Sequence, residues 1–441
     1  MSRCCRRWRR RRRAPSDAVP ARSVGARRPL RRGRRGASGL AGGAARVYDR
    51  SAMELPPLNP ELVTDADAVR RVCRRAAAVG TVALDTESDS LHSYHHKVCL
   101  IQLSFNGEHA VLDPLAIGRD GLQPLAEVLA DPGVLKLMHG ADYDLRVLDR
   151  DLGARVVHLV DTQLAAQLLG EPQTGLAALV EREAGVTLDK RYQRADWGAR
   201  PLPAELLAYA AGDTAYLELV RARLAARLDD LGRGAWWAEE CGALEAVRWE
   251  APVPDPLAFE RIKGAKKLAG EARDRIAALH AWREGVASAD DVPPFKILRG
   301  ETMLALAVAP PADLEALGAT PGVGRGTVRR AGKEILRVLA SPPPLPPRAK
   351  GPRFAVDRER EGRVQKAREA RDLIAKELAI EPGVLAPRAA LEKVVDGRPA
   401  DEVALAECLG RRWRASVLAP ALLPLAAAWR EGARRPDAAP A

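Results

Sequence analysis

Hydrophobic and polar positions between residues 65 and 112 follow first a helical and then a strand period. Residues 65–79 carry Ala, Val and Cys at helical spacing, and Asp65 stands where an N-cap residue is expected. Three short apolar runs follow, at residues 81–85, 98–104 and 108–112. Asn106-Gly107 separates the last two runs, and this dipeptide is a strong hairpin signal. The pattern therefore predicts a helix followed by an antiparallel meander of three strands.

After Asp113-Pro114 the pattern alternates between strands and helices. The predicted strands are residues 134–139 and 156–161. The predicted helices are residues 141–152, 162–169, 175–184 and 203–228. Such alternation after a meander indicates an α/β domain with a mixed sheet. We place this domain at residues 53–240, with its last element near Trp237.

The rest of the chain reads as helical. No convincing strand pattern follows residue 255, and residues 258–340 and 354–435 each contain a few amphipathic helices. Residues 341–353 (SPPPLPPRAKGPR) form a stiff, Pro-rich linker between these two modules. We therefore predict one α/β domain followed by two small all-α domains that serve for binding.

Charge is distributed unevenly, which changes how the net charge of +12 is interpreted. Residues 1–50 hold seventeen Arg and only two acidic residues, so this segment alone carries +15 and the remainder about −3. The folded body is nearly neutral, and its charge is no argument for RNA binding. Residues 1–52 lack apolar periodicity and are predicted to be a disordered tail. If this tail is translated, it either binds phosphates non-specifically or targets the chain to an organelle. Alternatively, translation begins at Met53 and the tail is not part of the protein.

Cysteine and hydropathy patterns narrow the class of protein. The six cysteines show no spacing typical of zinc sites, so we expect reduced thiols. No apolar run reaches the roughly 18 residues of a membrane span, and the N-terminus lacks the apolar centre of a signal peptide. We expect a cytoplasmic protein without a membrane partner, and no feature indicates an obligate protein partner.

Three groups of acidic residues are candidates for chemistry. Asp85 and Glu87 stand at i and i+2 of a strand, so both carboxylates project from one face, where a divalent cation would offset their repulsion. Asp142 and Asp144 compete for a second position at the start of a helix. Tyr209 and Asp213 form the third group, at i and i+4 of a predicted helix, and therefore share one face.

In chain order these motifs resemble the DEDD exonuclease superfamily, in its Tyr-containing branch. Asp85 and Glu87 fit the first motif, and Tyr209 with Asp213 fits the third. The resemblance selects Asp144 over Asp142, because the family aspartate lies five residues after the motif histidine, here His139. Further similarity to the ribonuclease D family is carried by Leu100–Ser104 (LIQLS), Asp161-Thr162 and Asp196–Leu202 (DWGARPL).

This resemblance implies a ribonuclease H-like 3′ to 5′ exonuclease domain that hydrolyses phosphodiesters with two divalent metals. It implies that Asp85, Glu87 and Asp213 bind one cation, and that Asp85 and Asp144 hold the second, Asp144 through water. Tyr209 would orient a water molecule or help to deprotonate it. An all-oxygen ligand set suits Mg²⁺ or Mn²⁺ rather than zinc. The expected products are nucleoside 5′-monophosphates.

Two further polar residues are candidate RNA contacts. His139 either touches the terminal nucleotide or is a structural histidine within the domain. Gln102 lies in the middle of a strand and either faces the substrate or is a buried hydrogen-bonding group.

Residues 268–340 resemble the HRDC domain. The resemblance is carried by Leu279–Glu284 (LHAWRE), Val292–Leu298 (VPPFKIL) and Leu317–Gly324 (LGATPGVG). The Pro-Gly-Val-Gly turn opens a helix that begins near Gly326. This turn is either a phosphate site or a tight interhelical turn beside a solvated basic face. The residues that would reinforce a phosphate site are Arg325, Arg329, Arg330 and Lys333.

Residues 354–435 resemble a second, diverged HRDC-like domain, in which Leu409–Trp413 (LGRRW) replaces the phosphate-type turn. One nuclease domain with two such modules is similar to bacterial ribonuclease D, which implies structured RNAs with short 3′ tails, notably tRNA precursors, as substrates. Two alternatives remain open at this point. A DNA-directed 3′ to 5′ exonuclease would use the same carboxylates, and a non-catalytic RNA-binding pseudo-nuclease would need a lost ligand.

Overall fold

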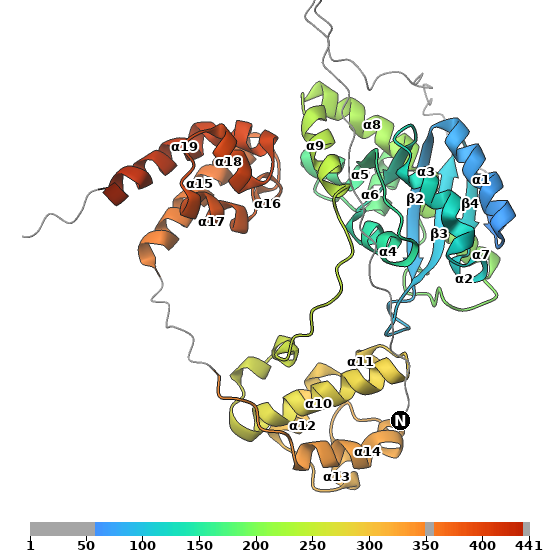
Figure 1. Ribbon diagram of the computed structural model, residues 1–441, viewed down its shortest axis with the longest axis vertical. Coiled ribbons are helices and arrows are strands. Elements are labelled where there is room, and N and C mark those ends of the chain that lie inside the picture. Colours follow the sequence, from blue (N-terminus) through green and yellow to red (C-terminus); the bar gives the residue numbers. More distant parts are fainter. Residues whose placement is uncertain (1–57, 349–356, 435–441) are drawn as a thin grey trace, which may run out of the picture. The chain divides into compact units, whose positions relative to one another are not determined.

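The computed structural model describes residues 58–348 and 357–434 (Figure 1). The predicted disordered tail, residues 1–52, and the end of the Pro-rich linker lie outside the described residues. An α/β domain comes first along the chain, and two helical modules follow it. Among the described helices, none combines the length and the apolar character that crossing a membrane requires.

The α/β domain is built on one mixed sheet of six strands in the order β1-β4-β3-β2-β5-β6. The strands are β1 (Glu61–Val63), β2 (Thr81–Ser88), β3 (Val98–Phe105), β4 (Glu108–Leu112), β5 (Leu135–Met138) and β6 (Leu159–Asp161). β2, β3 and β4 pair antiparallel, which confirms the predicted meander, and the other neighbours pair parallel. Asn106 and Gly107 have φ of 48° and 80°, as a tight hairpin turn requires.

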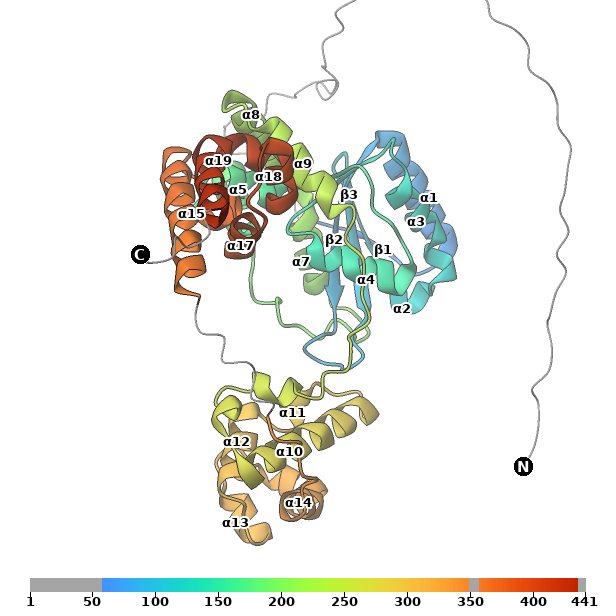
Figure 2. The ribbon, with the colours of Figure 1, turned by 60° about the vertical axis from the view of Figure 1, so that its left-hand side comes forward.

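Helices cover both faces of this sheet (Figure 2). Those packed on the first face are α1 (Ala66–Val79), α3 (Gln123–Ala130) and α4 (Asp142–Leu152). Those packed on the second face are α7 (Ala204–Ala215) and α8 (Leu217–Asp230). Along β2, Val82 and Leu84 enter the first core, whereas Ala83 packs with Leu217 on the second face. By this alternation the side chains of Asp85 and Glu87 lie on the second face, beneath α7.

The remaining elements of the domain complete its ends. They are α2 (Pro114–Ile117), η1 (Asp120–Leu122), α5 (Thr162–Leu168), α6 (Leu176–Ala184) and α9 (Gly234–Leu244). α1 begins at its expected cap, because the Asp65 carboxylate accepts a hydrogen bond from the Ala68 N–H at 2.8 Å. α9 contributes Trp237 and Cys241 to the core and ends at Leu244, so the domain extends past residue 240, where the sequence pattern placed its end.

Three elements differ from the prediction. The short β1 was not predicted, and β2 continues three residues beyond Asp85. The predicted helix 203–228 is two helices, α7 and α8, which meet at Tyr216. The Thr214 hydroxyl explains where α7 ends, because it donates to the carbonyl of Ala211 and lies 2.6 Å from the Ser104 hydroxyl on β3. Such bonds from a Thr side chain to its own helix loosen and bend the helix.

The first helical module contains a compact core of its own. Its elements are η2 (Ala258–Arg261), η3 (Ala265–Lys267), α10 (Gly270–Ala289), α11 (Pro294–Ile297), α12 (Gly300–Val308), α13 (Leu314–Ala319) and α14 (Arg325–Ala340). Leu279, Leu306 and Ile335 are fully buried where α10, α12 and α14 meet. As predicted, α14 opens directly after the Pro-Gly-Val-Gly turn, with Gly324 as its N-cap.

The second helical module is also formed by helices alone. These are α15 (Arg358–Glu377), α16 (Pro382–Leu385), α17 (Arg388–Gly397), α18 (Glu402–Leu409) and α19 (Arg412–Arg434). Val394, Leu405 and Leu418 are fully buried within it. In line with the prediction, the described residues beyond 255 contain no strand. α18 ends at Gly410, whose φ of 72° suits a left-handed C-cap.

Candidate active site

Three carboxylates from two elements converge beneath α7. Asp85 and Glu87 extend from the second face of β2, and Asp213 approaches them from the last turn of α7. One oxygen from each of the three lies within 4.8 Å of the others. Asp85 and Glu87 project from the same face because side chains two apart on a strand share a face. The packing of α7 on that face of the sheet brings Asp213 to them.

Asp144 is the fourth carboxylate, and it lies beside the cluster of three. It occupies the first turn of α4, is only 7% exposed, and its Oδ1 accepts a hydrogen bond from the Thr86 hydroxyl. Asp142, the competing residue, is exposed and forms a bidentate ion pair with Arg146 at 2.8 and 3.1 Å. The structure therefore brings Asp144, and not Asp142, to the carboxylate cluster.

The start of α4 is held by Asp161, which the sequence motifs had marked only as part of the Asp-Thr pair. The Asp161 carboxylate caps α5 by accepting from the Gln163 N–H, and it also accepts from the N–H groups of Gly140 and Ala141 at 3.1 and 2.8 Å. Gly140 has φ of 70°, which permits this tight turn after β5. Asp161 thus fixes the turn from which Asp144 is presented. In the sequence, the only indication that Asp161 matters was its place in the Asp161-Thr162 pair.

Burial raises the pKa values of all four carboxyl groups. Burial, then the charges of the neighbouring carboxylates, raises the pKa of Asp85 well above its usual range and that of Glu87 to about 8. Burial also raises the pKa of Asp213 to about 7. The pKa of Asp144 rises to about 6, since burial outweighs the hydrogen bond from Thr86.

In the part of the chain that the structure describes, no Lys or Arg side chain offsets this repulsion. Within residues 58–348 and 357–434, none of the four carboxylates forms an ion pair with Lys or Arg. Half-buried carboxylates that crowd together without a cationic partner are costly unless they bind protons or a metal. The donor set is entirely oxygen, which fits Mg²⁺ or Mn²⁺ rather than zinc. The residues present therefore fit the divalent cations that their pattern predicts.

Tyr209 stands one turn before Asp213 on α7, packed between two aromatic residues. Its ring centroid lies 5.9 Å from that of Trp197 and 5.8 Å from that of Tyr192. Burial, and then the charges of Asp213 and Glu87, raise the pKa of Tyr209 far above its usual value. The phenol is therefore neutral at physiological pH and acts as a hydrogen-bonding group. Trp197 is 2% exposed and belongs to the core beneath Tyr209.

An ion pair between a partly exposed arginine and a buried aspartate fixes the loop that carries Trp197, and sequence reasoning did not identify it. Arg200 donates to both carboxylate oxygens of Asp113 at 2.7 Å, and also to the carbonyls of Trp197 and Cys99. The charge and hydrogen bonds of Arg200 hold the pKa of Asp113 below its usual value, although burial opposes this. Arg200 lies within the DWGARPL motif, and the similarity of this motif to the family was the only indication in the sequence that Arg200 matters.

Of the two candidate RNA contacts of this domain, Gln102 is buried and His139 is half-buried. Gln102 is 0% exposed, pairs across the sheet with Asp85, and has no hydrogen-bond partner for its carboxamide among the described residues. His139 Nδ1 lies 2.9 Å from the Thr162 hydroxyl, which itself donates to the Met138 carbonyl. The hydroxyl must therefore accept from Nδ1, which leaves the buried Nε2 as an acceptor. That these two residues contact RNA remains a prediction.

The four basic residues of the first helical module lie on one helix. Arg325, Arg329, Arg330 and Lys333 all belong to α14, and their side chains are exposed. In the part of the chain that the structure describes, none of the four forms an ion pair. They form an available cationic face directly after the Pro-Gly-Val-Gly turn.

Comparison with known proteins agrees with this geometry. A model of the 3′-5′ exonuclease family matches residues 60–229, and a model of the HRDC domain matches residues 272–339. Ribonuclease D of Acidiphilium cryptum (strain JF-5) is 36% identical over 292 residues, which cover 65% of this chain and 73% of the relative. Ribonuclease D of Escherichia coli (strain K12) is 33% identical over 291 residues, covering 66% and 76%.

Solved structures show the same likeness. The E. coli ribonuclease D structure is 27% identical, with a TM-score of 0.60, and covers 83% of this chain and 98% of that one. The catalytic core of RRP6 from Trypanosoma brucei has the same identity and TM-score, covering 65% and 80%. These findings confirm the predicted family, fold class and enzyme class. The chain belongs to the ribonuclease D family and is a metal-dependent 3′ to 5′ exoribonuclease, with a ribonuclease H-like domain followed by a helical HRDC region.

Proposed function

We propose that this exoribonuclease uses two divalent cations, Mg²⁺ or Mn²⁺, to trim tRNA precursors from their 3′ ends, releasing nucleoside 5′-monophosphates. One observation carries the proposal. Three carboxylates lie within 4.8 Å of one another, a fourth lies beside them, and no Lys or Arg in the described part of the chain neutralises them.

Each carboxylate has a role in this proposal. Asp85, Glu87 and Asp213 hold one cation, and Asp85 with Asp144 holds the other. When bound, the cations supply an activated water and stabilise the charge on the departing 3′ oxygen. The Thr86 hydroxyl donates to one carboxylate oxygen of Asp144, and the other oxygen is left to accept from a water molecule bound to the cation. Because the pKa of Asp144 is about 6, this carboxylate is ionised at neutral pH.

Tyr209 positions the attacking water in this proposal rather than taking its proton. A phenol whose pKa is raised by burial and by neighbouring carboxylates stays protonated at neutral pH. It can donate one hydrogen bond and accept another, which fixes the direction of a water molecule. The rings of Trp197 and Tyr192 restrict where the hydroxyl can point. The proton of the water must therefore leave by another route, such as bulk water.

The substrate proposal rests on the helical region and on the relatives. The E. coli ribonuclease D of known structure is described as an exoribonuclease involved in structured RNA processing. In this chain the cationic face of α14 provides four exposed positive charges for the phosphates of such an RNA. A structured RNA that ends in a short single-stranded tail supplies both a 3′ end for the nuclease domain and a backbone for the HRDC domain.

The test is digestion of a tRNA carrying a short 3′ extension by the full chain, in Mg²⁺ and separately in Mn²⁺. We expect stepwise release of 5′-monophosphates that slows when the extension has been removed. The matched controls are the mature tRNA and a DNA oligonucleotide with the sequence of the extension. Faster digestion of the DNA than of the RNA would replace the tRNA proposal with a DNA-directed one. Binding without cleavage in either metal would contradict catalysis itself.

A further inference from the structure

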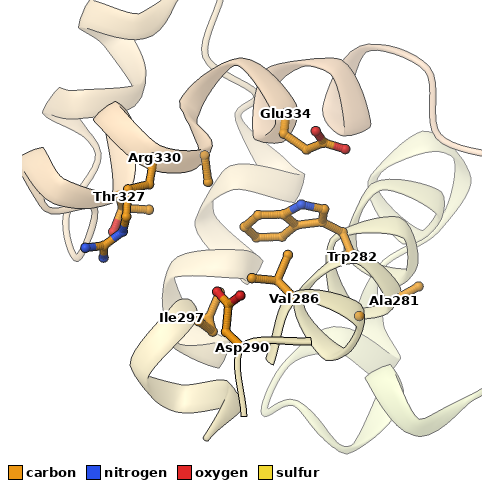
Figure 3. Close-up of a pocket in the computed structure, with 10 residues that line it drawn as sticks. Ala281, Trp282, Val286, Asp290, Ile297, Thr327, Arg330 and Glu334 are labelled. Carbon is orange, nitrogen blue, oxygen red and sulfur yellow. The ribbon is translucent and has the colours of Figure 1, made fainter. Parts of the chain in front are cut away.

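The first helical module contains a cavity between α10, α11 and α14 that the catalytic site does not use (Figure 3). Its volume is about 520 Å³, within the range of ligand-binding pockets. The indole of Trp282 extends across it, with Val286 and Ile297 on one side and Glu334 on the other. We propose that this cavity binds one base of the single-stranded RNA substrate, which is stacked against Trp282. This inference rests on the proposed RNA substrate and adds a base site to it.

The shape and polarity of the cavity favour a nucleobase over a purely apolar ligand. Trp282 is half-buried, so its indole is held by packing and still reaches the cavity. An indole face is a stacking surface for any base, because every base has a π-face. Thr327 and Asp290 also line the cavity, and their hydroxyl and carboxylate groups can meet the amino and carbonyl groups on a base edge. An aliphatic side chain of a protein partner would leave both groups unused.

Charge around the cavity complements a nucleic acid backbone. Arg330 lines the cavity itself, and Arg329 and Lys333 are its exposed neighbours on α14. Within the described residues these three cations form no ion pair. The carboxylate of Glu334, which would repel a phosphate, is instead paired with Arg337 at 2.8 Å. A base in the cavity therefore has positive charge available for the phosphates on either side of it.

Gly285 provides a way to fill the cavity without disturbing the fold. It lines the cavity near the C-terminal end of α10, and a Cβ added there meets no atom within 4 Å. Gly285→Leu would thus add its Cβ at the cavity wall without a clash, and Leu favours a helix more than Gly does. Gly362→Leu is the matched control. Gly362 is likewise an exposed glycine within a helix, α15, and a Cβ there also meets nothing within 4 Å.

The test measures the Kd of the full chain for a fluorescent twelve-nucleotide single-stranded RNA by anisotropy. Both glycine variants are made in a chain that also carries Asp144→Asn, so that hydrolysis does not interfere. We expect Gly285→Leu to raise the Kd about ten-fold, the loss typical of one stacked base, and Gly362→Leu to change it less than two-fold. The slope of log Kd against log salt should not change, because no phosphate contact is lost.

A second measurement locates the base directly. A 4-thiouridine in the same RNA is photo-crosslinked to the chain, and the crosslinked peptides are identified by mass spectrometry. Crosslinks to the peptide that contains Trp282, reduced by Gly285→Leu, support the inference. Equal Kd values for the two glycine variants, with no crosslink to that peptide, would overturn it and leave the proposed function standing. A parent chain that binds no RNA would overturn the proposed substrate and the base site together.

Discussion

The carboxylate cluster makes the metal-free enzyme less stable as pH rises, and Asp213→Asn should remove part of that loss. The pKa of Asp213 rises from its usual value near 3.8 to about 7 because the folded chain buries it. A folded-state pKa above the unfolded value means that protonation favours folding. The resulting stability is fully present below pH 3.8 and is lost as pH rises through about 7. Asn stands in for the protonated carboxyl group and keeps this stability at every pH.

The expected size follows from the pKa change. A rise from 3.8 to about 7 corresponds to about 4 kcal/mol, at roughly 1.4 kcal/mol for each pH unit. This is an upper bound, because Glu87 can take up a proton in place of Asp213. For a domain of this size each kcal/mol shifts Tm by about 2–4 °C. The quantity to measure, with a chelator present, is the Tm of Asp213→Asn minus the Tm of the wild type. This difference should grow by up to about 8–16 °C between pH 4 and pH 9.

Divalent cations should narrow the difference in stability between the two proteins. A ligand that binds only the folded state adds about 2.7 kcal/mol at one hundred times its Kd. The wild type should gain this stability from Mg²⁺ at pH 8, whereas Asp213→Asn should gain much less. Differential scanning calorimetry of the full chain measures both effects, and the transition that responds to Mg²⁺ reports the nuclease domain.

The control for this experiment is Asp142→Asn, which removes the same charge. Asp142 is exposed and already paired with Arg146, so it should reproduce the pH profile and Mg²⁺ response of the wild type. Parallel pH profiles for wild type and Asp213→Asn, or an equal rise in Tm of both on adding Mg²⁺, would refute the reasoning from burial and charge.

Three further predictions follow from the site. Tyr209→Phe should lower kcat about a hundred-fold at an unchanged Mg²⁺ half-saturation, because it removes a water-orienting hydroxyl and no metal ligand; a raised Mg²⁺ requirement would contradict this. The Mg²⁺ concentration for half-maximal activity should fall as pH rises from 6 to 8, since protons compete for carboxyl groups with pKa values of about 6–8; a requirement independent of pH would count against the cluster. Arg200→Ala should cost about 1–2 kcal/mol in urea unfolding, because Asp113 loses its cationic partner while Arg200 is itself partly exposed; a loss below about 0.5 kcal/mol would show that the pair does not hold the loop.

Local patterns predicted most of the fold, and tertiary contacts decided the remainder. The hairpin at Asn106-Gly107 and the cap at Asp65 depend on a few neighbouring residues, so the sequence is enough to place them. The break between α7 and α8 depends on the Thr214 hydroxyl meeting Ser104 across the domain, 110 residues away in sequence. No local pattern contains that contact, and the sequence therefore predicted a single helix.

The candidate site shows the same division. Spacing alone placed Asp85 with Glu87 on one face of a strand and Tyr209 with Asp213 on one face of a helix. That the two faces meet is a matter of topology, and only the family resemblance implied it in advance. Asp161 and Arg200 were missed as positioning residues because each reaches backbone groups distant in sequence, at Gly140 and at Cys99. A side chain that supports a site from outside leaves little trace in the spacing of motifs.

The most direct test of the account is a single-turnover assay that compares Asp144→Asn with Asp142→Asn, two residues apart on α4. The substrate is a single-stranded RNA labelled at its 5′ end, with saturating Mg²⁺. The account predicts that Asp142→Asn shortens the RNA from its 3′ end at a rate within about two-fold of the wild type, and that Asp144→Asn is slower by at least about a thousand-fold. Equal rates for the two variants, or a greater loss in Asp142→Asn, would contradict the assignment of the catalytic centre.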